Sequence, residues 1–514
     1  MSLLGSLIQN SARIGAFAET NRLTPADQQY YELYALLRKA RNTAFGRFYG
    51  FTDIRESYNM IEAFQRQVPA ADYNALYDRW WSQAYLCDSP DVCWPGRVPY
   101  YALSSGTSQA ASKIIPVTED MFKSMKRGSR RLFYDMNNFS LRPNQFTKHM
   151  LMVGSCTAPK REGLHWSGDL SGILGLNRPI WLERYYRPGR EITDLPEWNM
   201  RIDRIAEEAP GWDIGFAVSN PMWLQLILER IIDRYKLEHI HQLWPNFNVF
   251  VHGSVFFDPY RPSFEKLLGH PINYVDSYLA SEGFFAYQRH PSNRAMKMLT
   301  DCGIFFEFVP FNDQNFDENG DLRSPYPEAH TLYDVREGEN YAMLISTTAG
   351  AWRYLLGDTV QFTDAANAEM KLTGRTKQYL SVCGEHLSID NLNAAVQRAD
   401  ELLNVGIREF TVAGVRDENG TDWNHRWFVS VENNSVSAEA LAKVLDEALS
   451  QLNDDYAVER IYALKKVSVQ IVPNDIFLNW LEDRGKLNGQ AKVPRVLKGK
   501  NFEEFVAFAK EAGY

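Results

Sequence analysis

The sequence predicts an α/β protein with a large N-terminal domain and a smaller C-terminal one. Three observations lead to this prediction: the chain has 514 residues, apolar runs of strand length alternate with helical patterns, and the alternation restarts after Asp364. A chain this long exceeds what one hydrophobic core usually supports, so two domains are expected. The residues are 45% hydrophobic and 23% charged, which is typical of a globular enzyme and unlike a disordered or fibrous chain.

The first ninety residues have the spacing of helices. Thr24 followed by Pro25 is a typical helix start, because the threonine hydroxyl can cap the first turn and proline fits its first position. Leu33, Leu36 and Leu37 then recur at helical intervals. These helices are expected to be packing elements.

From Trp94 onward, short apolar runs alternate with Gly, Pro and Ser. Runs of strand length occupy 151–155, 247–254 and 341–348, and a helical pattern occupies 223–235. Strands that alternate with helices predict an α/β core.

The pattern after Asp364 is that of a second, compact domain. Strands are expected within 408–415, 426–432 and 467–473, and an amphipathic helix over 438–452. We therefore place the boundary near residue 375, which gives domains at 1–374 and 375–514. The sequence has no repeat of fixed period and no low-complexity tract, so a solenoid is not expected.

Composition excludes several classes of function. A net charge of −9 and a pI near 5.7 give no general electrostatic footprint for nucleic acid. The N-terminal segment lacks a basic region and a sustained apolar region, and no stretch approaches the roughly 20 apolar residues that span a bilayer. We expect no nucleic-acid partner, no membrane association and a cytoplasmic location.

The cysteines agree with a reducing compartment. Their number is odd and no two form a CxxC pair, so we expect neither a disulfide nor a structural zinc. The five are Cys87, Cys93, Cys156, Cys302 and Cys383.

The most informative stretch is SSGTSQAASKIIP at 104–116. Ser104, Ser105, Thr107 and Ser108 place four hydroxyls within five residues, and Lys113 adds a cation. Hydroxyls and backbone N–H groups at this density suit phosphate oxygens. The pattern of a Walker nucleotide site is absent, and a simple polar turn explains the stretch equally well.

A second stretch, VDSYLASEGFFAY, contains Tyr278, Ser281 and Glu282 between a strand end and an aromatic run. A tyrosine ring can stack on a purine, and a glutamate can hold a magnesium ion that bridges phosphates. Alone, the stretch is more often an ordinary strand end with an exposed acid.

Two further polar positions follow in the chain. Asp358 comes directly after Gly357, where its carboxylate can accept hydrogen bonds from both hydroxyls of a ribose, although a Gly-Asp hairpin turn is the simpler reading. Arg375 lies at the expected domain junction, from which it can reach a phosphate or ribose. A histidine on a loop, such as His386, is more often incidental than catalytic.

Near the C-terminus, Lys492 lies in the polar segment 489–495. A lysine on a mobile small domain can stabilise the charge that builds on an α-phosphate or acyl oxygen during reaction. A surface lysine is the ordinary explanation for any single instance.

Taken together and in this order, the motifs resemble the adenylate-forming superfamily and, more closely, the auxin-responsive acyl acid amido synthetase family. The resemblance covers nearly the whole chain, from Phe45 to Lys498. Each motif is weak by itself, and the set is specific. The motifs are SSGTS at 104–108, YLASE at 278–282, FFEFVP at 305–310, STTAGAWRYLLGD at 346–358, NDDYAVER at 453–460 and GQAKVPR at 489–495.

The resemblance implies a large N-terminal domain with a β-barrel and mixed β-sheets flanked by helices, and a small C-terminal α/β lid, with ATP and Mg²⁺ between them. It implies that Glu282 ligates the metal and that Arg375 and Lys492 act from hinge and lid. The carboxylic acid would become an acyl adenylate and then an amide of an amino acid. The expected nucleotide contacts are Ser104, Ser105, Thr107 and Ser108 at phosphates, Tyr278, Ala280 and Ser281 at adenine and α-phosphate, and Asp358 at the ribose.

The chain departs from the plant pattern at two places. Gln109-Ala110-Ala111 stand where plant members usually carry glycines, and Glu385-His386 stand where they carry an Asp-Lys pair. We keep His386 and Lys113 as candidate nucleotide contacts. Residues 120–185 are expected to supply part of the acyl pocket, including Met125, Phe133, Trp166 and Trp181.

Two other functions fit the same fold. In one, coenzyme A accepts the acyl group and the product is a thioester. In the other, the chain is a non-catalytic nucleotide-binding regulator. A glycosidase with paired carboxylates is not favoured, because no spacing singles out such a pair.

Overall fold

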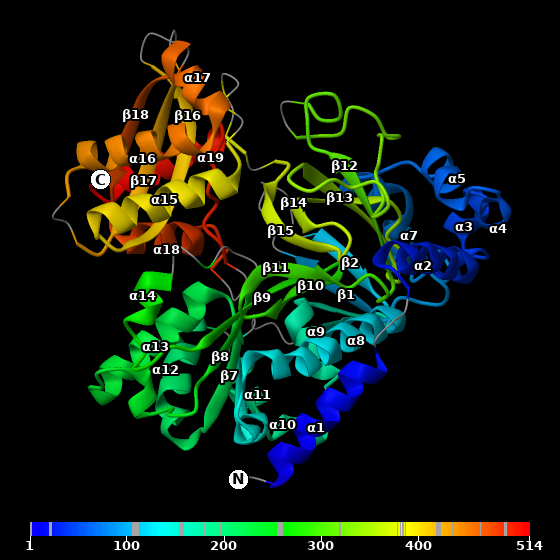
Figure 1. Cartoon of the computed structure of the whole chain (residues 1–514), viewed down its shortest axis with the longest axis horizontal. Helices are drawn as coiled ribbons and strands as arrows, with labels where there is room; N and C mark the ends of the chain where they lie inside the picture. The colour runs from blue at the N-terminus through cyan, green and yellow to red at the C-terminus, as the bar shows by residue number, and fades with distance from the viewer. Residues whose placement is uncertain are drawn as a thin grey trace. The chain divides into compact units, whose positions relative to one another are not determined.

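The structure is a computed structural model of the whole chain (Figure 1). It forms two compact units, Met1–Ser254 with Gly269–Lys371 and Val255–Leu268 with Leu372–Tyr514. The structure describes the chain except for 1–2, 20–22, 105–112, 154–158, 179, 196, 254–256, 258–260, 318–319, 378, 381, 383–384, 386, 418–422, 434–435, 463 and 488–490.

The first unit begins with helices, as the spacing predicted. Thr24 caps α2, since its Oγ1 accepts a hydrogen bond from the backbone N–H of Asp27 at 3.1 Å. Leu33, Leu36 and Leu37 are buried on this helix. The helices are α1 (Leu3–Ala18), α2 (Pro25–Ala40), α3 (Ala44–Phe48), α4 (Phe51–Glu56), α5 (Met60–Gln67), α6 (Tyr73–Leu76), a π-helical turn (Tyr77–Trp81) and α7 (Ser82–Leu86).

A four-stranded sheet follows in the order β2-β1-β5-β4. Strands β1 and β2 are antiparallel, and Ser104 at the end of β1 lies opposite Lys113 at the start of β2. The hydroxyl-rich segment is therefore the connection between two paired strands. The strands are β1 (Tyr100–Ser104), β2 (Lys113–Val117), β4 (Lys160–Glu162) and β5 (His165–Gly168).

The largest sheet has eleven strands in the order β12-β13-β14-β15-β11-β10-β9-β8-β7-β3-β6. Neighbouring strands are parallel along the series β9-β8-β7-β3-β6. They are antiparallel along the series β9-β10-β11. Its strands are β3 (His149–Val153), β6 (Tyr186–Arg187), β7 (Ile214–Ser219), β8 (Val249–Gly253), β9 (Asn273–Ala280), β10 (Gly283–His290), β11 (Asn293–Met298), β12 (Ile304–Pro310), β13 (Asn340–Thr347), β14 (Tyr354–Asp364) and β15 (Glu369–Arg375).

The three apolar runs predicted as strands overlap β3, β8 and β13, and the helix predicted at 223–235 lies within α13. The predicted mixed α/β class, with mixed sheets and helices, is therefore confirmed. The β-barrel implied by the resemblance stays a prediction, because the sheet orders given above do not close into a ring among the described strands. The remaining helices of this unit are α8 (Glu119–Asp135), α9 (Leu170–Leu176), α10 (Ile180–Glu183), α11 (Arg190–Thr193), α12 (Trp198–Glu208) and α13 (Pro221–Tyr235), with 3₁₀ turns at Met136–Phe139, Pro143–Thr147, Ala209–Gly211 and Ile240–Gln242.

The second unit, drawn mainly in yellow to red in Figure 1, contains a three-stranded sheet in the order β16-β17-β18. All three strands and the helix predicted after Asp364 are present, and Phe410, Trp427 and Leu445 are buried in its core. The elements are α14 (Arg261–Glu265), α15 (Ile389–Leu403), β16 (Ile407–Arg416), β17 (Trp423–Val431), α16 (Ala438–Leu452), α17 (Asp454–Tyr462), β18 (Leu464–Ile471), α18 (Asn474–Asp483) and α19 (Lys500–Glu511).

Among the helices of the described residues, none combines the length and the apolar character that crossing a membrane requires.

Candidate active site

The hairpin between β9 and β10 positions the first group of candidate residues. Ala280 pairs with Gly283, so Ser281 and Glu282 form the two-residue connection between the strands. Both side chains are buried, with 8% of each residue exposed. A buried carboxyl in a tight turn is unusual, because acidic turn residues normally face water. Glu282 is therefore a candidate for binding rather than for solubility.

Asp358 comes from a different strand and meets Tyr278. The Tyr278 hydroxyl donates a hydrogen bond of 2.6 Å to Asp358 Oδ2. The register between β13 and β14 shifts where Gly357 and Asp358 lie, and Gly357 has φ +89°. A Gly at positive φ in a bulge turns the following side chain out of the regular alternation. The Gly-Asp pair is thus an irregularity within a strand and not a hairpin turn.

Tyr354 joins this group, although sequence reasoning did not select it. Its hydroxyl donates to Glu282 Oε1 at 3.2 Å and accepts from Lys113 Nζ at 3.2 Å. Tyr354 is fully buried at the start of β14, the strand that carries Asp358. The one available signal was its place inside the motif 346–358.

Lys113 faces this cluster from the start of β2. Its ammonium lies 5.6 Å from the ring centre of Tyr73 and 5.8 Å from that of Tyr354. The Tyr73 hydroxyl also accepts a hydrogen bond of 2.9 Å from the backbone N–H of Ile114. Two aromatic faces therefore hold the ammonium beside Glu282, since ring faces attract cations at such distances.

The neighbours of Glu282 have opposing effects on its pKa. Burial raises the pKa of Glu282 and the nearby charge of Asp358 raises it further, whereas Lys113 and the Tyr354 hydroxyl act to lower it. A carboxyl whose charged form is disfavoured in this way gains from a cation placed beside it.

The donor atoms of this cluster fit magnesium. Within the described part of the chain, no three or more His, Cys, Asp or Glu gather as a metal site. Mg²⁺ commonly takes only one or two carboxylates and completes its shell with phosphates and water. Glu282 with its oxygen-bearing neighbours suits a metal that arrives with a nucleotide.

Three domain models of one family match most of the chain. They are the GH3 family N-terminal domain at residues 17–165 and 131–272, the GH3 family central domain at 297–375 and the GH3 family C-terminal domain at 390–501. The chain belongs to the GH3 family. The resemblance drawn from the motifs is therefore confirmed at the level of the family.

Single proteins give the same relationship. The chain is 26% identical over 275 residues to "Indole-3-acetic acid-amido synthetase GH3.4" of Arabidopsis thaliana, a match that covers 50% of this chain and 45% of that protein. The chain thus spans less than half the length of this curated relative.

Two solved structures have a similar fold. "AtGH3.15 acyl acid amido synthetase in complex with 2,4-DB" superposes with a TM-score of 0.75 at 17% identity and covers 98% of this chain and 96% of that one. A 2-hydroxyisobutyryl-CoA ligase in complex with 2-HIB-AMP superposes with a TM-score of 0.61 at 15% identity. This match covers 94% of this chain and 91% of that one. The expected fold of the adenylate-forming enzymes is thereby confirmed.

Several predicted residues of this GH3 protein lie outside the described residues. Ser105, Thr107 and Ser108 belong to this group, as do 109–111 and His386. The backbone of Ser104 is described as the end of β1. Their roles stay predictions.

Two predicted residues belong to the second unit. Arg375 is the last residue of β15, and Lys492 lies in a segment that runs beside β16. The N–H of Val412 donates to the carbonyl of Arg495 at 2.9 Å, and the N–H of Leu497 donates to the carbonyl of Val412 at 2.9 Å. These bonds attach the chain around Lys492 to the sheet.

Glu385, one half of the Glu-His departure, has a structural environment. It is fully buried, and both of its carboxylate oxygens lie 3.0 Å from the backbone N–H of Val382, which donates to them. Nε2 of the equally buried His425 lies 2.9 Å from Glu385 Oε1. Glu385 therefore organises the interior of the C-terminal unit.

The residues suggested for the acyl pocket do not all lie on one element. Met125 is buried on α8. Phe133, on the same helix, makes an edge-to-face contact with Phe146, with 5.7 Å between the ring centres. Trp166 lies on β5 and is 36% exposed. The side chain of Trp181 is not among those described. An acyl-binding role for these residues stays a prediction.

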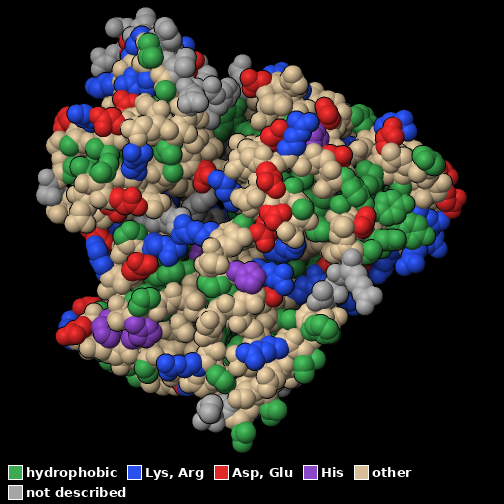
Figure 2. Space-filling model, in the orientation of Figure 1, with side chains coloured by type: hydrophobic (Ala, Val, Ile, Leu, Met, Phe, Trp, Pro, Cys, Tyr) green, Lys and Arg blue, Asp and Glu red, His purple; other side chains and the backbone are tan. Residues whose placement is uncertain are grey.

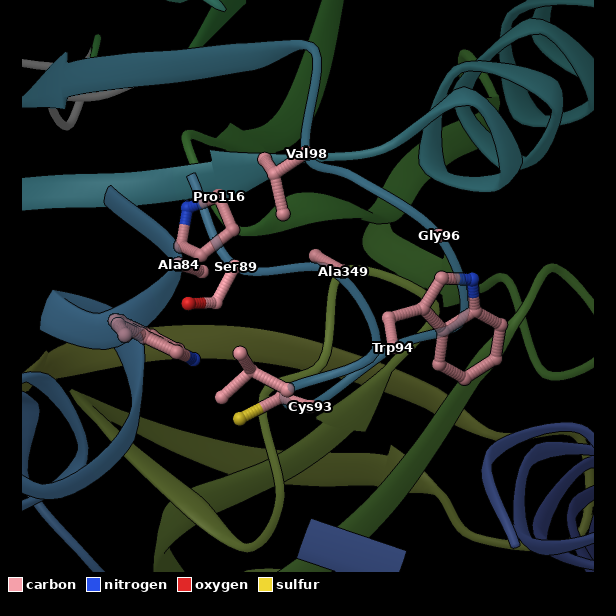
Figure 3. A pocket seen from close by; sticks show the side chains of 10 residues that line it. Ala84, Ser89, Cys93, Trp94, Gly96, Val98, Pro116 and Ala349 are labelled. Atoms are coloured by element: carbon pink, nitrogen blue, oxygen red, sulfur yellow. The ribbon is translucent and has the colours of Figure 1, made fainter. Parts of the chain in front are cut away.

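Two pockets of the first unit lie outside the Glu282 cluster. The one in Figure 3, between the chain before β1 and Ala349, has a volume of about 10 Å³ and would hold about one water molecule. The other, of about 250 Å³, lies between α2 and α8 and is lined by Glu32, Lys39, Asp120 and other residues. Burial raises the pKa of Asp120, but hydrogen bonds from Lys39, Trp94 and Lys123 outweigh burial and lower it to about 2.

Proposed function

We propose that this GH3 protein is an ATP-dependent acyl acid amido synthetase. It activates a carboxylic acid as an acyl adenylate and transfers the acyl group to the amine of an amino acid. The observation that supports this most is the convergence of Tyr278, Glu282 and Asp358 in one cluster of the first unit. The family and the activity named for its plant relative favour the same reaction.

Each member of the cluster has a proposed role toward ATP. Asp358 accepts hydrogen bonds from the ribose hydroxyls, and the Tyr278 hydroxyl, 2.6 Å from Asp358 Oδ2, orients that carboxylate. The backbone of Ala280 and the buried Ser281 border the adenine and the α-phosphate. The hydroxyls of Ser104, Ser105, Thr107 and Ser108 bind phosphate oxygens from the connection between β1 and β2.

Glu282 is the proposed magnesium ligand. When bound, the metal offsets negative charge on the phosphates and on the departing pyrophosphate. The Tyr354 hydroxyl, which accepts a hydrogen bond from Lys113, donates one to the Glu282 carboxylate and holds it in place. The protein thus supplies an oriented carboxylate with a neighbouring cation.

The reaction needs no covalent enzyme nucleophile. A substrate carboxylate oxygen attacks the α-phosphorus of ATP, and the bond from that phosphorus to the bridging oxygen of pyrophosphate breaks. An amine nitrogen then attacks the acyl carbonyl carbon, loses a proton, and AMP leaves. Lys492 and Arg375 are proposed to stabilise charge at the α-phosphate from the C-terminal domain, residues 375–514, which we propose acts as a lid that excludes water.

The other candidates are weaker. Coenzyme A as acceptor would use the same fold, as the ligase named above does, but family membership favours an amine. A non-catalytic regulator would not need a buried acid that faces Lys113. We propose a cytoplasmic location, with small-molecule acids and amines as partners.

Pyrophosphate exchange tests the first half of the proposal. Purified protein with ATP and Mg²⁺ should exchange labelled pyrophosphate into ATP only when a cognate carboxylic acid from a mixed panel is present. Mass spectrometry of the same reactions with the twenty amino acids and with coenzyme A identifies the acceptor. Thioester without amide would select the coenzyme A alternative, and no exchange with any acid would contradict adenylation.

A further inference from the structure

Helix α1 packs on the first unit through small side chains. Its buried residues are Gly5, Gln9 and Ala12. Gln9 Nε2 donates to the carbonyl of Leu141 at 3.2 Å, and a Cβ on Gly15 would lie only 2.4 Å from the Tyr134 ring. The small residues thus let the helix approach the domain closely.

Ion pairs fix the C-terminal end of α1. Glu19, one residue past the helix, accepts hydrogen bonds from Arg130 Nε at 2.8 Å and from Arg131 Nε at 3.0 Å on α8. Helix α1 is therefore part of the folded unit and has a defined outer face.

That outer face is apolar. Leu3, Leu7, Ile14 and Phe17 are 84%, 64%, 69% and 84% exposed. With about 100° between successive residues, all four lie within about 80° of one another around the helix. Figure 2 shows hydrophobic side chains along the position that α1 has in Figure 1. These four large apolar residues of α1 therefore face away from the domain, whereas Ile8 packs against buried residues of the first unit. The usual amphipathic arrangement is thus largely reversed.

The row of residues is self-complementary. Leu3, Leu7, Asn10, Ile14 and Phe17 follow at alternating steps of four and three residues, the spacing at which one helix packs along another. The row also reads nearly the same in both directions from the exposed Asn10. Reversing the helix about Asn10 brings Leu3 opposite Phe17 and Leu7 opposite Ile14.

We propose that α1 is a homodimer interface, in which it packs antiparallel against α1 of a second copy of this chain about a two-fold axis near Asn10. Such an interface is isologous, because the same surface serves both copies. Antiparallel helices also bring opposite ends of their dipoles together. This inference does not depend on the proposed activity.

The available area supports a weak, reversible dimer. With Leu4, which is 52% exposed, five large apolar side chains face outward. If a fully exposed side chain of this kind has an area on the order of 150 Å², the exposed fractions of the five would bury about 500 Å² per copy. The total of about 1,000 Å² is at the lower limit of specific interfaces. A membrane surface is the less favoured occupant, because Arg13 is the only basic residue of the helix and surface-binding helices are rich in Lys and Arg.

Sedimentation velocity of the full chain tests the interface. The wild type should pass from monomer to dimer between about 1 and 100 µM, and the double variant Leu7→Glu with Ile14→Glu should stay monomeric at every concentration. Leu402→Glu is the matched control, since Leu402 is 66% exposed on α15, and should dimerise like the wild type. Unchanged melting temperatures show that the variants fold, because each changed side chain lies at the surface.

Engineered cysteines test the orientation in a background that carries Cys87→Ser, which removes an exposed native thiol. Under mild oxidation, Asn10→Cys should form a covalent dimer, because the two positions meet at the axis. Phe17→Cys alone should not, because antiparallel helices place the two copies of that position about 20 Å apart. The proposal is overturned if the wild type stays monomeric at 100 µM, if the double variant still dimerises, if Phe17→Cys cross-links as well as Asn10→Cys, or if Leu7 and Ile14 serve instead to bind lipid vesicles.

Discussion

Glu282 in the first unit and Glu385 in the second are both buried glutamates, and their surroundings differ. Both oxygens of Glu385 accept from the Val382 N–H, and His425 is its second neighbour. Glu282 accepts hydrogen bonds from the Tyr354 hydroxyl, at 3.2 Å, and from its own backbone N–H, and it lies near Asp358, whose negative charge disfavours its own. A buried acid whose hydrogen-bond partners belong to the domain interior, as for Glu385, stabilises the fold. A buried acid beside a second negative charge, as for Glu282, is set up to bind a cation. Burial alone does not separate the two roles, and the partners do.

The largest effect is expected at Asp358, the acid that opposes the charge of Glu282. Asp358→Asn keeps the shape of the side chain and removes the charge that would accept two ribose hydrogen bonds. We expect adenylation to fall by roughly 100-fold, from the loss of about 2–3 kcal/mol of charged hydrogen bonding. Pyrophosphate exchange measures this. Asp364→Asn, at the exposed end of the same strand, is the control and should retain wild-type exchange.

Exchanging the two glutamates for glutamine tests the comparison directly. Glu385→Gln should lower the free energy of unfolding by about 2–3 kcal/mol, because an amide cannot accept through both of its terminal atoms and leaves buried groups unsatisfied. Glu282→Gln should leave stability unchanged or raise it, because burying a charge is no longer required, while adenylation falls, though by less than in Asp358→Asn. Urea unfolding with parallel activity assays separates the outcomes. Destabilisation by Glu282→Gln as large as that by Glu385→Gln would remove the distinction.

Glu32 is a partly buried glutamate of the first unit and extends the comparison to pH. Burial raises its pKa from 4.5 to about 7, against a hydrogen bond from the Gly303 backbone. Since the folded pKa lies above the unfolded one, the stability from this group is complete below pH 4.5 and is lost as the pH rises through 7. The free energy of unfolding of Glu32→Gln, relative to that of the wild type, should therefore rise by up to about 3 kcal/mol between pH 4.5 and 8. Unfolding free energies of both proteins across this range check it, and a difference that does not change with pH would contradict it.

The smallest effect concerns Tyr354, the residue that links Lys113 to Glu282. Tyr354→Phe removes the hydroxyl that bonds both the Lys113 ammonium and the Glu282 carboxylate. The Mg²⁺ concentration for half-maximal exchange should therefore rise about fivefold, or about 1 kcal/mol, with little change in the maximal rate. Tyr73→Phe is the control, because Tyr73 faces the same ammonium. If both variants shift the Mg²⁺ requirement equally, Tyr354 has no special role in positioning Glu282.

Local patterns were sufficient for much of the fold. The cap at Thr24, the buried positions of α2 and the strands β3, β8 and β13 follow from residue spacing alone, because these features depend on neighbours within a few residues. Tyr278, Glu282 and Asp358 were selected because their order along the chain resembles a known family. The Tyr278–Asp358 contact within the first unit agrees with that selection.

Contacts between distant residues were not predictable in this way. Tyr354 lies 72 residues from Glu282 and 241 from Lys113 in sequence, and no short-range pattern encodes such pairings. A Gly-Asp pair occurs both in hairpin turns and in bulges, so its residues alone do not distinguish the bulge at Gly357 from a turn. The spacing of α1 shows an apolar row, but only the fold reveals that Gly5, Gln9 and Ala12 pack inward and leave that row outside.

The central claim is that the acid is activated at the α-phosphorus of ATP. The most direct measurement is isotope transfer from a cognate carboxylic acid labelled with ¹⁸O in its carboxylate, followed through complete amide formation. The account predicts one ¹⁸O atom in the AMP that is released and none in pyrophosphate. Label in orthophosphate with ADP as the product, or AMP without label, would contradict it.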